Sequence, residues 1–143
     1  MRAVDLPYDM AEVIALNTQY VGIGAGGSVP MLARLSFIDY RGHVVYDKFV
    51  VLGVSHPASD TRDVGLYLPF RTALKTPNQV IGLQTLVWQL MRRKIQATHH
   101  NPVENARAVM DLFRSHEADW QKTISSGQWP CALPPTSYAR CYV

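Results

Sequence analysis

The feature that most constrains the fold of this sequence is an apolar segment, residues 13–22, that runs into a glycine-rich turn. It reads Val-Ile-Ala-Leu-Asn-Thr-Gln-Tyr-Val-Gly, with the polar side chains Asn17 and Gln19 at positions i and i+2. Successive side chains of a strand point to opposite faces, so a strand here places Asn17 and Gln19 on the same face. The pattern therefore predicts a buried strand that delivers two amides to one side of a sheet.

We predict this first strand over residues 12–21, and two further β segments follow it. Several glycines in residues 22–27 permit positive φ and a tight reversal. This turn lacks the lysine of a Walker loop, and no helix follows it, so a hairpin is favoured over a phosphate-binding loop. Strands over 31–40 and 43–52, separated by a turn at residues 41–42, complete a predicted antiparallel three-stranded meander.

The segment after the meander predicts short elements and one longer helix. The sequence allows a short strand over residues 61–64 and predicts a brief helix over residues 69–74. Apolar residues at helical spacing predict a helix over 79–97, with its start near Thr76-Pro77-Asn78. The basic residues 92–94 are expected to close that helix near its negative dipole end.

A last helix is predicted from Pro102 to about Ile124. Asn101 and Pro102 are a favourable N-cap and first helical residue, and the Ser-Ser-Gly sequence at 125–127 is expected to end the helix. This helix places residue 105 in its first turn and residue 100 in the loop just before it. Its expected core face consists of Ala106, Val109, Met110, Phe113 and Trp120.

Composition favours one globular domain. The chain has 143 residues, of which 48% are hydrophobic and 17% charged. A chain of this length can bury a hydrophobic core without disulfides or structural metals. We expect a lead-in over 1–11, a folded domain over 12–125 and a proline- and aromatic-rich tail over 126–143. A net charge of +3 is compatible with phosphate contacts but is well below that of a dedicated nucleic-acid binder.

The sequence predicts an intracellular protein, nuclear or cytoplasmic, with no membrane partner. Its N-terminus lacks the basic and apolar regions of a signal peptide, and no apolar run approaches the ~20 residues of a membrane span. Only Cys131 and Cys141 occur, too few for a secreted disulfide framework or a zinc site. We interpret them as two thiols.

Two segments, ALNTQYVG and MLARLSFIDYRGHVVYDKFV, resemble the opening of the DEDDh 3′–5′ exonucleases, and most closely their RNA exonuclease 4-like branch. The opening strand of that family carries Asp-x-Glu, where this chain has Asn17-x-Gln19. The resemblance implies an α/β, RNase H-like fold. Its expected parts are the three-stranded antiparallel meander, a reduced parallel portion and the C-terminal helices packed with them.

Residues 99–108, His-His-Asn-Pro-Val-Glu-Asn-Ala-Arg-Ala, resemble the His-x4-Asp segment of the same family. His100 stands at the general-base position, and Asn105 stands where the last metal-binding Asp belongs. In the family, carboxylates hold two Mg²⁺ or Mn²⁺ ions that activate a water and stabilise the leaving oxygen. Mg²⁺ prefers anionic oxygen ligands, so this chain keeps the shape of the site without its charge, and no metal cofactor is expected.

The middle of the family pattern is missing. Between Gly53 and His56 the family carries a helix, a strand and the helix that bears the second Asp, whereas this chain has only Val54 and Ser55 there. The similarity resumes at His56 and reaches about residue 122, which implies one internal deletion. In the RNase H fold the first strand pairs with the deleted strand, so an exposed sheet edge is expected unless another segment covers it.

These observations favour a catalytically inactive exonuclease-like domain, with Asn17, Gln19, His100 and Asn105 as a relict site. It would act in protein interaction or assembly, with homodimerisation through the open sheet edge or the tail, or in residual binding of nucleic acid such as RNA. The alternative is an active metal-dependent 3′–5′ RNA exonuclease whose acids were substituted or replaced by others. A nucleic-acid groove would use the basic residues Arg34, Arg41, Arg92, Arg93, Lys94 and Arg107.

Two acids lie nearest to the relict segments, and both have ordinary structural interpretations. Asp63 is expected in a turn or at a strand end. Glu104 is expected in the first turn of the last helix, where a negative charge favours the helix dipole.

Overall fold

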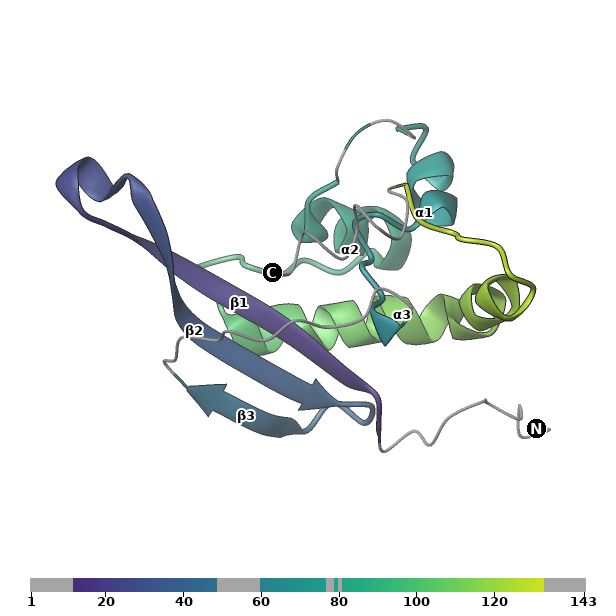
Figure 1. Cartoon of the computed structure of the whole chain (residues 1–143), viewed down its shortest axis with the longest axis horizontal. Coiled ribbons are helices and arrows are strands. Elements are labelled where there is room, and N and C mark those ends of the chain that lie inside the picture. The colour runs from purple at the N-terminus through teal and green to yellow at the C-terminus, as the bar shows by residue number, and fades with distance from the viewer. Residues whose placement is uncertain (1–11, 49–59, 77–78, 80, 133–143) are drawn as a thin grey trace. The chain divides into compact units, whose positions relative to one another are not determined.

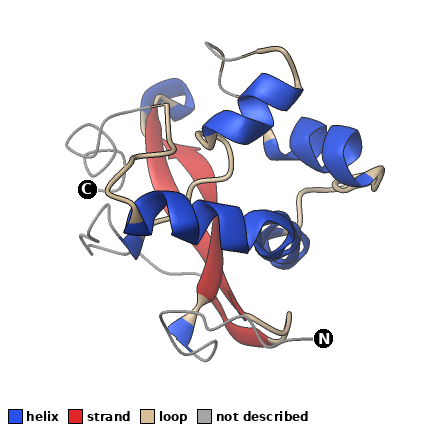
Figure 2. Cartoon of the chain, turned by 90° about the vertical axis from the view of Figure 1, so that its right-hand side faces the viewer, coloured by secondary structure: helices blue, strands red, loops and turns tan. Residues whose placement is uncertain are grey.

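The computed structural model describes residues 12–48, 60–76, 79 and 81–132, and these form a mixed α/β structure (Figure 1). Figure 2 shows the strands gathered in a single sheet. The fold class predicted from the sequence is therefore confirmed. The elements are β1 (Ile14–Ile23), the short 3-10 helix η2 (Ala25–Gly27), β2 (Val29–Asp39), β3 (Val44–Lys48), α1 (Leu68–Ala73), α2 (Leu83–Met91) and α3 (Pro102–Ser125).

The described residues form two compact units. The sheet unit contains residues 12–48 and 95–111, and the helical unit contains the rest of the described chain. Helix α3 contributes its first turns to the sheet unit and the remainder to the helical unit. Each unit is described separately below.

The three strands form an antiparallel sheet in the order β1-β2-β3, as the meander pattern predicts. β1 and β2 make a long hairpin that extends beyond β3 toward its turn (Figure 1). At that turn Gly24 and Gly27 have φ of +76° and +67°, which is why glycine is required there. A Cβ at Gly22 would also collide with the carbonyl of Gly27, so the close approach of the two strands needs a glycine at this position.

The buried side chains of the sheet unit come from β1, where Ala15 is buried, from β2, and from the segment that leads into α3 and forms its first turns. Leu35 and Ile38 are fully buried on β2, and Ile95 is buried in the segment before the helix. Ala106 and Met110 continue the core along α3, as its helical spacing predicts.

The core of the helical unit is an aromatic cluster around Trp120. The Tyr67 ring stacks on the Trp120 indole with centroids 3.9 Å apart, and Phe70 meets Tyr67 edge-on at 4.9 Å. Phe113 meets Trp120 edge-on, with ring centroids 5.9 Å apart. Among the described helices, none has a stretch long and apolar enough to cross a membrane.

Two expectations for the second half of the chain are wrong. Residues 61–64 are not a strand, because Asp63 turns the chain: its Oδ1 accepts the Gly65 N–H at 2.8 Å and its carbonyl accepts the Leu66 N–H at 3.1 Å. The described part of the sheet therefore has no parallel portion. The predicted helix over 79–97 is only α2, because Arg92 adopts a left-handed conformation, φ +54°, and ends the helix.

The other helices agree with prediction in position and extent. α1 occupies Leu68–Ala73 and α3 runs from Pro102 to Ser125. β3 ends at Lys48 among the described residues, so the predicted continuation to residue 52 lies outside them. The lead-in over 1–11 and most of the tail over 126–143 also lie outside the described residues.

Candidate functional site

A polar pocket of about 300 Å³ lies in the sheet unit, between β1 and the start of α3. The structure brings together all four residues predicted as the relict site, although Asn17 and Gln19 are far from His100 and Asn105 in the sequence. Two residues that sequence analysis did not single out, Thr18 and Tyr20, join them. The lining is Asn17, Thr18, Gln19, Tyr20, His100 and Asn105.

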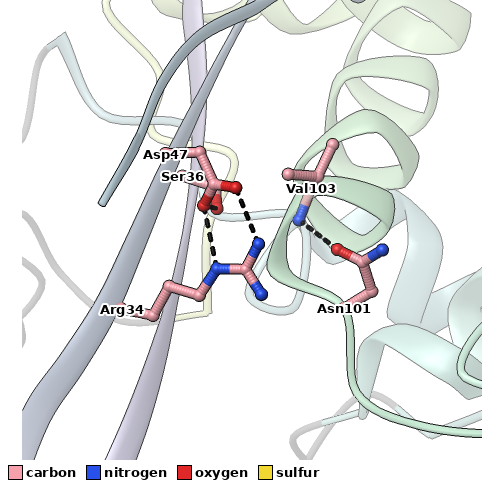
Figure 3. Close-up of polar contacts among 5 residues, drawn as sticks. All are labelled: Arg34, Ser36, Asp47, Asn101 and Val103. Atoms are coloured by element: carbon pink, nitrogen blue, oxygen red, sulfur yellow. Dashed lines mark hydrogen bonds and ion pairs between the residues drawn. The ribbon is translucent and has the colours of Figure 1, made fainter. Parts of the chain in front are cut away.

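Local sequence signals position both sides of this pocket. Asn17 and Gln19 are half-buried alternate residues of β1, opposite Ser36 and Arg34 of β2. On the other side, Asn101 caps α3: its Oδ1 accepts the Val103 N–H at 3.0 Å (Figure 3). This cap fixes where the helix begins and hence sets Asn105 in its first turn.

Asn105 is held by hydrogen bonds at both ends of its side-chain amide. Its Nδ2 donates to Asn17 Oδ1 at 3.3 Å, and its Oδ1 accepts a hydrogen bond from Gln96 Nε2 at 2.8 Å. Asn105 is only 7% exposed, so these bonds satisfy a buried polar group. Amides at positions 17, 96 and 105 thus form a hydrogen-bonded chain, and at positions 17 and 105 the resemblance implies carboxylates.

Gln96 is a residue of this site that sequence analysis missed. It lies in the loop before α3 with φ +58°, and its backbone N–H donates to Glu104 Oε2 at 2.9 Å. The sequence pattern placed residue 96 inside a helix, so nothing indicated that its side chain would reach Asn105. Glu104 itself lies in the first turn of α3, as predicted.

The residues present do not fit a two-metal centre. The lining offers amides, a hydroxyl, a phenol and an imidazole, and the oxygens of Asn17 and Asn105 already accept N–H groups. Neutral amide oxygens do not supply the anionic charge that pairs of divalent cations require. Throughout the residues that the structure describes, no three His, Cys, Asp or Glu side chains gather in a group that could hold a metal ion.

Arg34, predicted to contact nucleic acid, is engaged within the sheet. Its Nε and Nη2 donate to the two carboxylate oxygens of Asp47 at 2.9 and 2.6 Å, and Ser36 Oγ donates to the same carboxylate at 2.7 Å (Figure 3). The hydrogen bond to Asp47 raises the pKa of the Arg34 guanidinium. This bidentate ion pair joins β2 to β3 beside Asn17 and Gln19 of β1.

The other predicted basic residues are exposed and fall in both units. Arg107 Nε donates to the Gly42 carbonyl at 3.0 Å, which brings this arginine of α3 next to the turn that carries Arg41. The basic cluster of Arg92, Arg93 and Lys94 follows α2 in the helical unit, where Lys94 Nζ lies 5.6 Å from the centre of the Trp88 ring.

Comparisons with known proteins confirm the resemblance to RNA exonuclease 4-like nucleases. No family model matches the chain. RNA exonuclease 4 of Debaryomyces hansenii is 28% identical over 168 residues, covering 79% of this chain and 60% of that protein. The human apoptosis-enhancing nuclease is 27% identical, covering 85% of this chain and 54% of that protein. The chain thus spans little more than half the length of these curated relatives.

The solved structures that resemble the chain include the pseudoubiquitin hydrolase-RNA exonuclease module of Saccharomyces cerevisiae Pan2. The TM-score is 0.48 at 12% sequence identity, with 80% of this chain and 32% of that chain covered.

The alignments also show that the relatives contain residues that this chain lacks. The match to the Debaryomyces protein is 168 residues long, more than the whole 143-residue chain, yet it covers only 79% of the chain. The surplus positions stand opposite gaps in this chain, as an internal deletion requires. The predicted deletion point between Gly53 and His56 lies outside the described residues.

Proposed function

We propose that this chain is an exonuclease-like domain that does not hydrolyse nucleic acid and that now acts by binding. The observation that carries the proposal is the hydrogen-bonded amide chain through Asn17, Asn105 and Gln96. Metal-dependent hydrolysis needs carboxylates at such a site to hold the ions that generate hydroxide. Amides that hydrogen-bond to one another keep the pocket folded and give it no net charge.

His100 does not replace the missing chemistry by itself. A positioned general base contributes about 10²–10⁴-fold to a rate, whereas enzymes typically accelerate their reactions about 10⁶-fold or more. His100 is exposed at the pocket, and the pocket lining contains no carboxylate to orient it or to hold a metal-bound water. We therefore expect no turnover above background.

The test is the degradation of end-labelled single-stranded RNA in Mg²⁺ or Mn²⁺ by the unchanged chain and by a His100→Ala variant. The proposal predicts no degradation above a protein-free control for either protein. Degradation that disappears in His100→Ala would show an active 3′–5′ exonuclease and overturn the proposal. The His100 substitution makes this distinction because it removes only the imidazole at the mouth of the pocket.

For the present role we favour protein interaction and assembly. β1 lies at the end of the described sheet, and several of its apolar side chains are exposed. Exposed apolar strands of this kind are typical of surfaces that pair with another chain. The tail, the other predicted interaction element, lies mostly outside the described residues.

Binding of nucleic acid is the second candidate, and the position of Arg107 favours it. Its hydrogen bond to Gly42 places two exposed arginines, Arg41 and Arg107, at one corner of the sheet unit. Phosphate contacts would make the affinity fall steeply with salt. Fluorescence anisotropy with single-stranded RNA should then show weaker binding for Arg41→Gln/Arg107→Gln and a shallower salt dependence, and salt-independent binding would remove this candidate.

A further inference from the structure

We propose that two copies of this chain pair antiparallel through β1, so that their sheets join into one. This inference rests on the assembly role proposed above and names its partner as a second copy. β1 is the end strand in the order β1-β2-β3 among the described residues, and its ten residues include no charged residue and no proline. Natural edge strands usually carry such residues to prevent pairing, so β1 has the character of a paired strand.

The geometry of β1 is also suited to pairing along its length. The register shift at Gln19 and Tyr20 leaves Ala33 of β2 without a partner, so the extra residue is on β2 and β1 remains continuous. Ile14, Leu16 and Tyr20 occupy even positions of the strand and are 51%, 52% and 59% exposed. Asn17 and Gln19 occupy the odd positions between them.

A two-fold axis at Thr18 gives a self-complementary register. It places Leu16 opposite Tyr20 of the second copy, Thr18 opposite Thr18, and Asn17 opposite Gln19 of the second copy. Aliphatic–aromatic pairs and Thr–Thr pairs are favourable directly opposite each other across strands. Opposed amides can exchange hydrogen bonds, because each carries both a donor and an acceptor.

The same register explains why amides at positions 17 and 19 matter for assembly. With Asn17→Asp and Gln19→Glu, two carboxylates would face each other twice across the junction, and like charges directly opposite are destabilising. The amides thus remove this repulsion as well as the charge of the pocket.

The available surface indicates a reversible dimer. Pairing through β1 brings ten residues of each copy to the junction, among them the exposed Ile14, Leu16 and Tyr20. A standard interface of about 1,600 Å² involves roughly 20–30 residues a side, so this junction is smaller than standard. We therefore expect a dimer that dissociates on dilution.

Sedimentation velocity and light scattering across a concentration series test the proposal. The chain should approach twice its 16.0 kDa mass as its concentration rises. Leu16→Lys/Tyr20→Lys should raise the dissociation constant by at least about tenfold, because lysines then replace the central apolar pairs. The control is Val45→Lys on β3, where the native side chain is 58% exposed, and it should leave the dissociation constant unchanged. Circular dichroism checks that each variant is folded.

Cysteine cross-linking provides a second readout that does not depend on weakening the dimer. Residues directly opposite in antiparallel strands have Cα atoms about 4.5–5.5 Å apart, within the range of a disulfide. On oxidation Thr18→Cys should give a covalent dimer on non-reducing gels, and Val45→Cys should not. The native thiols Cys131 and Cys141 contribute equally to both variants.

The outcomes separate this inference from the proposed loss of hydrolysis. A monomer at every concentration, or a dimer disrupted by Val45→Lys and not by Leu16→Lys/Tyr20→Lys, overturns pairing through β1. Either result leaves the nuclease assay to decide hydrolysis on its own. A dimer with the predicted response supports the inference even if RNA degradation were found.

Discussion

The side-chain amide of Asn105 donates a hydrogen bond to Asn17 Oδ1 at 3.3 Å and so joins two residues 88 positions apart. This bond connects the first turn of α3 to the middle of β1 within the sheet unit. Carboxylates at both positions would repel each other unless a cation lay between them. Two amides, in contrast, hold this contact without a bound cation.

The first prediction follows from this contact. Asn17→Asp/Asn105→Asp should lower the midpoint of thermal unfolding by several degrees in a chelator, because two close carboxylates replace a hydrogen-bonded pair. Mn²⁺ should recover part of the loss. Differential scanning fluorimetry measures both effects, and Asn17→Ser/Asn105→Ser is the uncharged control. A midpoint equal to that of the unchanged chain in chelator would contradict this account of the contact.

The second prediction concerns Gln96, whose amide satisfies the buried oxygen of Asn105 at 2.8 Å. Gln96→Ala should reduce the free energy of unfolding by about 1–3 kcal/mol, since it leaves a buried acceptor without its donor. Urea denaturation measures the change. The exposed Gln89 on α2 provides the matched control, and Gln89→Ala should change stability by less than about 0.5 kcal/mol.

The part of this site that local signals control was predictable from the sequence. The alternation around Asn17 and Gln19, the glycines of the turn and the Asn101 cap each act within a few residues. They therefore located β1, the hairpin and the start of α3. Gln96 was not predictable, because its role depends on a left-handed loop conformation in a segment whose composition favours helix.

Three further features differ from the sequence-based expectation or were left open by it. The sequence predicts Arg34 to be an exposed basic residue, and only the pairing of β2 with β3 shows that it faces Asp47. The early end of α2 depends on a left-handed Arg92, a conformation that non-glycine residues adopt uncommonly. Asp63 was open between a strand end and a turn, and its hydrogen bond to the Gly65 N–H determines the turn.

The third prediction tests the cap that positions Asn105. Asn101→Ala should cost about 0.5–2 kcal/mol of unfolding free energy, because the Val103 N–H loses its acceptor. Asn101→Ser should recover most of that loss, since serine also caps helices well. Chemical denaturation of the three proteins measures the series. Equal losses for alanine and serine would show that capping is not the source of the effect.

The fourth prediction uses Tyr67, whose burial against Trp120 raises the pKa of its phenol. Because the folded-state pKa lies above the unfolded value, this contribution to stability is fully present below about pH 10 and is lost as the pH rises further. Denaturation at pH 8 and at pH 11 should show a larger fall for the unchanged chain than for Tyr67→Phe. An equal fall in both proteins would assign the alkaline loss to other groups.

The most direct test of the central claim is isothermal titration of Mn²⁺ into the unchanged chain and into Asn17→Asp/Gln19→Glu/Asn105→Asp. We predict no binding heat for the unchanged chain and clear binding for the variant, because the three substitutions supply the anionic oxygens that the pocket lining lacks. Saturable binding of Mn²⁺ to the unchanged chain at this pocket, abolished by Asn105→Ala, would contradict the account and restore the interpretation of the chain as an active nuclease.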